Sequence, residues 1–141
     1  MSVAYVADSS IFASIVVKDE FYERAKAFVK RFSGSIATLD FALIEVASAL
    51  WRHSHLLRRV PEERYAQLRG SIKPLIYGAA KVYRAENLVE EALDNAVKLG
   101  VTVYDSLYVT LALQERCKLA SFDEELRKRL EKAGLKIAVP P

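Results

Sequence analysis

The sequence predicts an α/β fold with a parallel sheet. Two observations lead to this prediction. Short continuous apolar runs have the composition of strands that are buried on both faces, and segments with apolar residues at helical spacing lie between them. Strands that alternate with helices along a chain usually pair in parallel. The chain has 141 residues, of which 52% are hydrophobic, so it can form one domain with a sizeable core.

Two strands and four helices are expected in the first half of the chain. The strands are short apolar runs at residues 3–7 and 36–38. The helices are expected at residues 11–17, 21–32, 40–55 and 61–70. Gly34 is expected to end the second helix, and Thr38 or Asp40 to cap the third.

The second half is expected to contain three further helices and the last strands. Residues 72–85 contain Pro74 and Gly78 and match no regular pattern, and within them residues 81–84 are either a short strand or a linker. Beyond them, helices are expected at residues 87–99, 105–116 and 123–132, and strands at 118–121 and 136–139. An extended segment at 101–104 is expected to lead into a helix that Asp105 caps.

Cysteine content and charge exclude several classes of protein. Cys117 is the only cysteine, which excludes an intrachain disulfide and a cysteine-based zinc site and fits a reducing cytoplasm. No basic segment precedes Asp8, so a secretory signal is not expected. The longest apolar run, residues 11–17, is far shorter than the roughly 18 residues that a membrane span needs. The net charge of +3 permits an acidic partner such as nucleic acid without requiring one.

An aspartate ends the first predicted strand. Asp8 follows the run V-A-Y-V-A and precedes Ser9 and Ser10. In open α/β sheets, ligands bind at the edge formed by the carboxyl ends of the strands. Asp8 is therefore either the N-cap of the short helix that follows or a metal ligand or nucleophile at this edge.

Glu45 is the least ordinary acid in the chain. Its helical neighbours one turn away are apolar or small: Phe41, Ala42, Ser48 and Ala49. The pattern predicts that the Glu45 carboxylate points inward or into a cleft, where it needs an ion-pair partner or a metal. No basic residue lies within one turn of it on this helix, so an ion-pair partner would have to come from another element.

Two further acids occur where helix caps are expected. Asp105 precedes an apolar helix, and a cap needs only one carboxylate oxygen, which leaves the other for a metal. Ser121 and Glu124 fit the S-x-x-E capping box, which places Asp123 in the first helical turn and, like Asp8, just past a strand. If the four acids converge, their charges repel one another unless a divalent cation is present, and ligation by oxygen alone favours Mg²⁺ or Mn²⁺.

The order and context of these acids resemble the PIN-domain ribonucleases, most closely the VapC toxins of bacterial and archaeal toxin–antitoxin pairs. Asp8 in V-A-D-S-S matches the opening strand–Asp–hydroxyl motif of the family, and Glu45 in L-I-E-V-A-S-A-L matches its helical glutamate. Asp105 in V-Y-D-S-L-Y matches the third acid, with Tyr108 also as in the family, and Asp123 in L-A-S-F-D-E-E-L matches the fourth. The resemblance covers nearly the whole chain.

The resemblance implies a single PIN-like domain over residues 1–141, an α/β/α sandwich whose central parallel sheet has four to five strands flanked by helices. It implies a Mg²⁺- or Mn²⁺-dependent endoribonuclease, in which a metal-activated water attacks an RNA phosphodiester. The implied catalytic and metal-binding residues are Asp8, Glu45, Asp105 and Asp123, supported by Ser9 and Ser121. The implied partners are an RNA substrate, a small antitoxin protein and a second copy in a homodimer, in the cytoplasm and without a membrane.

Basic side chains follow the Glu45 helix. Arg52, Arg58 and Arg59 are candidates for holding RNA phosphates around the acidic centre, and the alternative is an ordinary solvated helix face. A second basic group at residues 127–132 is more typical of a solvated face.

The alternative functions are a housekeeping PIN-type RNA-processing nuclease and a catalytically silent PIN-fold interaction module. The retained acids favour an enzyme over the silent module, and the single expected domain favours a toxin. A haloacid-dehalogenase-type phosphatase would need a second aspartate where Ser10 stands.

Overall fold

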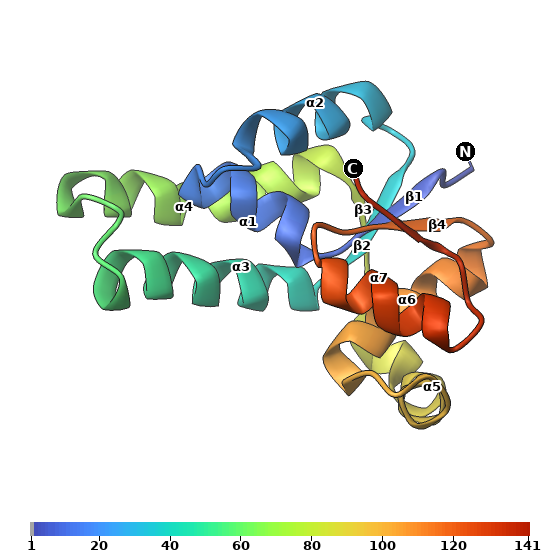
Figure 1. Cartoon of the computed structure of the whole chain (residues 1–141). Coiled ribbons are helices and arrows are strands. Elements are labelled where there is room, and N and C mark those ends of the chain that lie inside the picture. Colours follow the sequence, from blue (N-terminus) through green and yellow to red (C-terminus); the bar gives the residue numbers. More distant parts are fainter. Residues whose placement is uncertain (1) are drawn as a thin grey trace.

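The computed structural model describes residues 2–141 and contains a five-stranded parallel sheet (Figure 1). The strands lie in the order β3-β2-β1-β4-β5, so the first strand of the chain is central. Their bounds are β1 (Tyr5–Ala7), β2 (Ile36–Leu39), β3 (Lys81–Tyr83), β4 (Lys118–Ala120) and β5 (Ala138–Val139). All four neighbouring pairs are parallel, which confirms the predicted fold class. Of the two alternatives for residues 81–84, the strand is correct.

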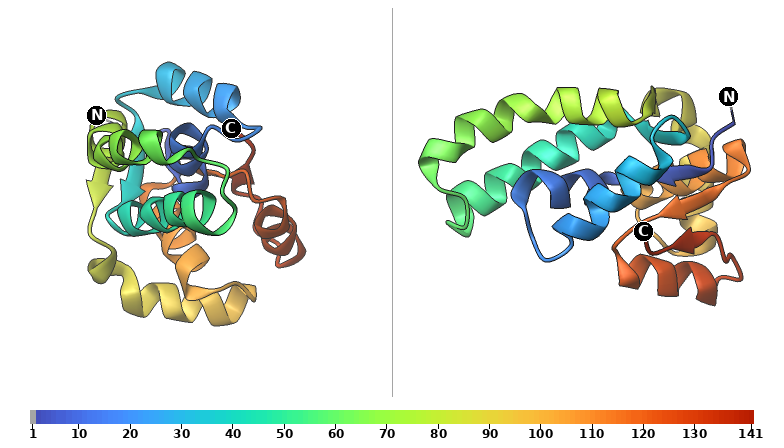
Figure 2. Two further views of the ribbon diagram at one scale, coloured as in Figure 1. Left: turned by 90° about the vertical axis from the view of Figure 1, so that its left-hand side faces the viewer. Right: turned by 90° about the horizontal axis from the view of Figure 1, so that it is seen from above.

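Within residues 2–141, seven α-helices flank this sheet. They are α1 (Ser9–Val17), α2 (Tyr22–Phe32), α3 (Phe41–Trp51), α4 (Glu62–Ala79), α5 (Val89–Leu99), α6 (Val103–Glu115) and α7 (Glu124–Lys132). Figures 1 and 2 show α2 and α4 on one side of the sheet and α5 and α6 on the other, as expected for an α/β/α sandwich. The same views show that α3 and α4 run side by side and form a hairpin that extends past the sheet.

The sheet and α6 form the centre of the core. All four residues of β2 are buried, and so are seven consecutive residues of α6, from Ser106 to Ala112. A helix that is buried on all sides must meet protein rather than solvent around its circumference. This packing fixes the first turn of α6, which carries Asp105, relative to the strand ends.

The hairpin of α3 and α4 differs from the prediction at both of its helices. The helix expected over 40–55 is α-helical only to Trp51 and continues as a π-helical turn, η1 (Arg52–Leu56). The helix expected to end near Gly70 continues through the unassigned segment to Ala79. Pro74 lies inside it and removes one backbone hydrogen bond, to the carbonyl of Gly70, but both residues are exposed, so water can reach that carbonyl.

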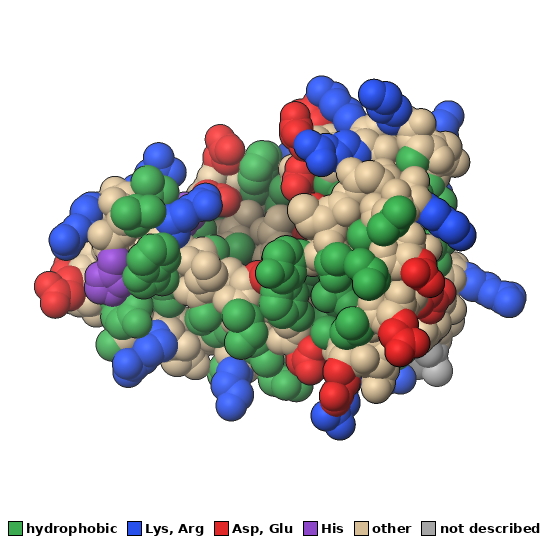
Figure 3. Space-filling view, turned by 90° about the horizontal axis from the view of Figure 1, so that it is seen from below, with side chains coloured by type: hydrophobic (Ala, Val, Ile, Leu, Met, Phe, Trp, Pro, Cys, Tyr) green, Lys and Arg blue, Asp and Glu red, His purple; other side chains and the backbone are tan. Residues whose placement is uncertain are grey.

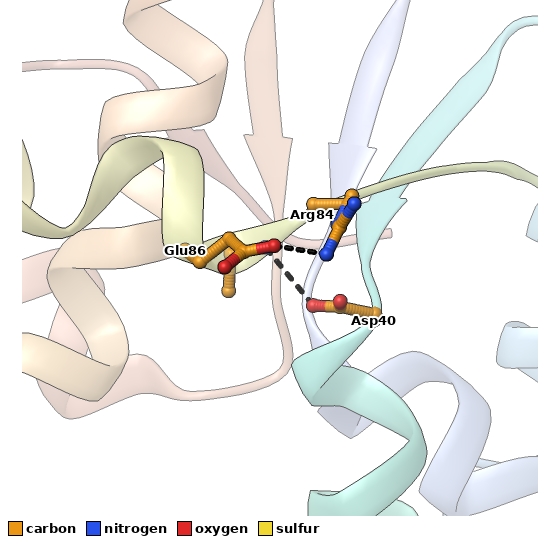
Figure 4. Close-up of polar contacts among 4 residues, drawn as sticks. Asp40, Arg84 and Glu86 are labelled. Atoms are coloured by element: carbon orange, nitrogen blue, oxygen red, sulfur yellow. Dashed lines mark hydrogen bonds and ion pairs between the residues drawn. The ribbon is translucent and has the colours of Figure 1, made fainter.

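Neither residue expected to cap α3 makes a capping hydrogen bond, although Asp40 occupies the N-cap position. The Thr38 hydroxyl donates a 2.7 Å hydrogen bond to the carbonyl of Ala7 on the neighbouring strand. Asp40 makes no capping hydrogen bond, and its Oδ1 accepts a 3.0 Å hydrogen bond from the backbone N–H of Ala85 (Figure 4). Arg84 and Glu86 form an ion pair beside this contact. Asp40 therefore ties the end of β2 to the segment that follows β3.

The caps of α6 and α7 also differ from the prediction. The helix expected to begin at Asp105 begins at Val103, and its N-cap is Thr102, whose side chain accepts a hydrogen bond from the backbone N–H of Asp105. The extended segment expected at 101–104 is therefore wrong at its last two residues. The N-cap of α7 is Asp123 rather than Ser121. The helix expected at 87–99 begins with a 3₁₀ turn, η2 (Ala85–Leu88).

No single helix within residues 2–141 is long and apolar enough to cross a membrane. The segments 85–99 and 103–115 reach that length and composition only together, and they are bent by 106° from each other.

Candidate active site

The parallel sheet brings the ends of β1 and β4 together, and an acid follows each of them. Asp8 comes directly after β1, and Asp123 is the third residue after β4, which pairs with β1. Glu45 lies on α3, which begins just after β2, and Asp105 lies in the first turn of α6. The charge of Asp105 raises the pKa of both Asp8 and Glu45, and the charge of Asp123 raises the pKa of Asp105. The four acids therefore act on one another through Asp105.

Asp8 is the most deeply buried of the four, with 7% of its surface exposed. Burial raises its pKa to about 7, while hydrogen bonds from Ser10 and Ser121 act in the opposite direction. Its Oδ1 also accepts a 3.0 Å hydrogen bond from the backbone N–H of Ser10, as an N-cap of α1 does. The N-cap alternative for Asp8 is therefore correct, and its role as a metal ligand or nucleophile at the sheet edge stays a prediction.

Glu45 is half-buried and is held by a tyrosine. The hydroxyl of Tyr108 donates a 2.6 Å hydrogen bond to Glu45 Oε1, and Tyr108 is 2% exposed. Burial raises the pKa of Glu45, and hydrogen bonds from Tyr108 and Ser9 partly oppose that shift. Among the ion pairs of residues 2–141 none includes Glu45, so its partner is a hydroxyl rather than the cation that the sequence left open.

Asp105 and Asp123 differ in what their side chains do. Burial raises the pKa of the Asp105 carboxyl, and Thr102 and Arg129 lower it. Asp123 is exposed, and its Oδ1 accepts a 3.0 Å hydrogen bond from the backbone N–H of Leu126 at the start of α7. Asp105 therefore uses its backbone for the cap of α6, whereas Asp123 uses one carboxylate oxygen for the cap of α7.

Ser10 joins the two acid-bearing segments, a role that the sequence analysis missed. Its hydroxyl donates a 2.5 Å hydrogen bond to Asp8 Oδ1 and accepts a 3.0 Å hydrogen bond from the backbone N–H of Phe122. The buried Ser121 is the neighbouring hydroxyl, and its Oγ accepts a 3.0 Å hydrogen bond from the backbone N–H of Asp123. A serine two residues after a capping aspartate is a local signal for the first contact. The second joins residues 112 positions apart, which no local pattern shows.

The donor set fits a hard divalent cation by its chemistry. The four acids offer only oxygen, and three of them have raised pKa values because burial and mutual repulsion disfavour their charges. A bound Mg²⁺ or Mn²⁺ would relieve both effects. Within residues 2–141, however, no three His, Cys, Asp or Glu side chains lie close enough around one point to hold an ion as they stand. Convergence of the four acids on one ion thus stays a prediction.

The predicted RNA-binding arginines lie apart from the acids. Arg52 is in the π-helical turn, and Arg58 and Arg59 follow it at the tip of the α3–α4 hairpin, all three exposed. Arg52 is seven residues beyond Glu45, which is roughly 10 Å along a helix. Figure 3 shows Lys, Arg and His side chains gathered at that end of the molecule.

Two arginines of α7 lie closer to the acids than the sequence indicated. Arg127 Nη1 donates a 2.7 Å hydrogen bond to the carbonyl of Ser121, and the charge of Arg129 lowers the pKa of Asp105. The second basic group is thus not only a solvated helix face.

Comparison with known proteins gives concordant results. The PIN domain family matches residues 5–131. Ribonuclease VapC3 of Pyrobaculum aerophilum is 34% identical over 126 residues, which are 88% of this chain and 92% of that protein. The crystal structure of PAE2754 from Pyrobaculum aerophilum has a TM-score of 0.74 at 24% identity, covering 99% of this chain and 92% of that one. Mycobacterium tuberculosis VapC20, described as a toxin that cleaves the sarcin-ricin loop, has a TM-score of 0.69 at 17% identity, covering 98% and 100%.

Proposed function

The chain belongs to the PIN-domain family, and we propose that it is a Mg²⁺- or Mn²⁺-dependent endoribonuclease, the toxin of a VapC-type toxin–antitoxin pair. The observation that carries this proposal is the group of acids centred on Asp105, which interacts electrostatically with the acid that follows β1 and with the acids on α3 and in the β4–α7 turn. The similarity to Ribonuclease VapC3 supports RNA as the substrate. We take residues 1–141 as one nuclease domain that acts in the cytoplasm.

One group of residues would bind the cation, and a second group would hold the first in place. Asp8, Glu45 and Asp105 would bind the cation, with Asp123 beside them. A bound cation supplies an activated water and stabilises the charge that develops on the phosphate. Ser10 and Tyr108 orient the carboxylates of Asp8 and Glu45 through hydrogen bonds. The remaining supporting roles are those of Ser9, which hydrogen-bonds Glu45, and Ser121, which hydrogen-bonds Asp8.

The hairpin tip would bind RNA outside the reacting phosphate. Arg52, Arg58 and Arg59 are exposed, so their long side chains can reach a phosphate backbone. None of them forms an ion pair within residues 2–141, so their charges are free for RNA. The tip would raise affinity without taking part in bond cleavage.

A homodimer is supported by an apolar surface on α3 and α5. Ile44, Trp51 and Val97 are 63%, 55% and 80% exposed. Figure 3 shows hydrophobic side chains between the basic hairpin tip and acidic side chains near α5. A twofold axis through this apolar surface would place the basic tip of each copy near the acidic end of the other, so the face is complementary to itself. A small antitoxin would be a separate partner, supported by the similarity to VapC3 alone.

The dimer is tested by the molar mass in solution. Size-exclusion chromatography with light scattering should give twice the chain mass for the wild type and for Tyr77→Glu, which alters an exposed aromatic of α4. Trp51→Glu should give the monomer mass. A monomeric wild type, or a dimeric Trp51→Glu protein, would contradict the proposed interface.

The nuclease activity is tested by cleavage of structured RNAs. We expect cleavage with Mg²⁺ or Mn²⁺, none with EDTA, and none with Asp8→Asn. Asp94→Asn is the matched control, because Asp94 is an exposed aspartate of α5 outside the acid group. Equal cleavage by Asp8→Asn and the wild type would refute the metal-site assignment, and absence of cleavage of any RNA by the wild type would refute the activity.

A further inference from the structure

We propose that Ser10 is a positioning residue that sets the placement of Asp8 relative to Asp123 and so controls cation affinity. The inference rests on the proposed metal site. Ser10 is not one of the four acids, so its proposed role can be disproved even where the metal site is correct.

The direction of the two hydrogen bonds at Ser10 is determined by chemistry. A backbone N–H can only donate, so the Ser10 hydroxyl must accept from Phe122. Its single proton is then available for Asp8 Oδ1, which lies 2.5 Å away. The two hydrogen bonds therefore form a chain that runs from the backbone of the β4–α7 turn, through the hydroxyl, to the carboxylate after β1.

This chain of hydrogen bonds holds Asp8 by one of its two carboxylate oxygens. Oδ1 accepts from the Ser10 hydroxyl and also from the Ser10 backbone N–H at 3.0 Å. Oδ2 accepts no hydrogen bond from either group of Ser10, so Ser10 leaves that oxygen open to other partners, which would include a cation. Ser10 thereby sets the orientation of the Asp8 carboxylate as well as its position.

The other end of the chain holds the turn that carries Asp123. Phe122, between Ser121 and Asp123, is fixed by its N–H on Ser10 and by its ring, which stacks on Phe21 with centroids 4.5 Å apart. The Ser121 hydroxyl accepts from the N–H of Asp123. Because this turn is anchored to Ser10, a shift of the hydroxyl would move Asp123 relative to Asp8.

The side chain at position 10 must therefore both donate and accept within a short reach. Threonine keeps the hydroxyl and should preserve both contacts, whereas alanine removes them together. Aspartate would accept from Phe122 but repel Asp8. Loss of a group that orients a metal ligand typically weakens metal binding by about 10- to 100-fold, which is the effect expected for Ser10→Ala.

The test is Mn²⁺ affinity measured by calorimetry on wild type, Ser10→Ala and Ser10→Thr. Ser71→Ala is the matched control, since the Ser71 hydroxyl also donates a hydrogen bond, of 2.7 Å to the carbonyl of Leu68, but lies in α4. We expect affinity to fall about 10- to 100-fold in Ser10→Ala and to stay within about threefold of wild type in Ser10→Thr and Ser71→Ala. Wild-type affinity in Ser10→Ala would overturn the role of Ser10. Failure of the wild type to bind Mn²⁺ would instead overturn the proposed metal site.

Hydrogen exchange tests the same inference, and its first measurement is on the wild type and needs no variant. The Phe122 amide should be protected from exchange in the absence of metal, because it donates to Ser10. In Ser10→Ala it should exchange faster while the amides of α6 stay protected. A rapidly exchanging Phe122 amide in the wild type would contradict the hydrogen bond on which the inference depends.

Discussion

The sheet edge and the hairpin tip carry the two sets of charged residues that matter for the proposed function, and they are built in opposite ways. At the edge, Asp8 and Glu45 are each bonded by hydroxyls from buried or half-buried residues. At the tip, Arg52, Arg58 and Arg59 are exposed. The acid side chains at the edge are thus held in place before a ligand binds, whereas the arginine side chains at the tip are ordered only when a ligand binds.

This difference separates what each region can do. Preorganised carboxylates would hold the cation that stabilises the negative charge developing on the phosphate, which affects the rate of cleavage. Exposed arginines neutralise phosphates at the cost of ordering their side chains, which affects affinity and its dependence on salt. Changes at the edge should therefore alter the rate of cleavage, and changes at the tip should alter binding.

The largest expected effect is on the residue that interacts with all the other acids. Asp105→Asn should lower the rate of RNA cleavage by about a thousandfold or more, because it removes the central carboxylate of the group while keeping its size. Single-turnover cleavage at saturating enzyme measures this rate, with Asp94→Asn as the control. A loss in affinity with no loss in rate would place Asp105 with the tip rather than with the edge.

Stability should change with pH in the direction that burial of Asp8 predicts. Its pKa is raised from 3.8 to about 7, so the folded state holds a proton that the unfolded chain has lost between these values. This contribution to the free energy of unfolding is present below about pH 4 and is lost as the pH rises through 7, by at most about 4 kcal/mol. Denaturant titrations in EDTA at several pH values should show a smaller loss in Asp8→Asn, whose side chain stays neutral, than in wild type, because only Glu45 and Asp105 still contribute to it. An identical pH dependence in both proteins would contradict the burial of an ionisable Asp8.

Substitutions at the hairpin tip should affect RNA binding and leave the cleavage rate unchanged. Replacing Arg52, Arg58 and Arg59 together with Gln should weaken RNA binding about 10- to 100-fold at low salt. The slope of the logarithm of the binding constant against the logarithm of the salt concentration should also fall, by the equivalent of up to about three phosphate contacts. Cleavage at saturating RNA should keep its rate. A reduced rate at saturation would show that the tip reaches the reacting phosphate.

A smaller effect is expected where a hydroxyl only orients an acid. Burial and the charge of Glu45 raise the pKa of Tyr108, so its hydroxyl stays protonated and donates to Glu45. Tyr108→Phe should lower the cleavage rate by about 10-fold and weaken Mn²⁺ binding to a similar extent, without changing RNA affinity. Unchanged Mn²⁺ binding would mean that Glu45 does not need this hydrogen bond.

The sequence predicted the parts of this comparison that depend on local pattern. The strands, the acids at their ends and the inward-facing Glu45 follow from apolar periodicity and from the rule that ligands bind at the carboxyl edge of a parallel sheet. Thr102 as the cap of α6 was also visible in principle, because a threonine three residues before an acid is close to a capping box. The sequence favours Asp105 as the cap instead, because the apolar run follows it directly.

The rest depends on contacts between distant parts of the chain. Asp40 has the sequence of a helix cap but bonds Ala85, 45 residues away, because the two strand ends meet in the sheet. Ser10 reaches Phe122 for the same reason. Pro74 hid the continuation of α4, since a proline on an exposed helix face is tolerated at a cost that the sequence does not show.

The most direct test of the central claim is a Mn²⁺ titration followed by electron paramagnetic resonance, in which bound ion no longer contributes to the signal of free Mn²⁺. Wild type and Asp94→Asn should bind Mn²⁺ saturably and with equal affinity, and Asp8→Asn and Asp105→Asn should lose that binding. Equal binding by all four proteins, or no binding by the wild type, would show that the acids at the sheet edge do not form a metal site.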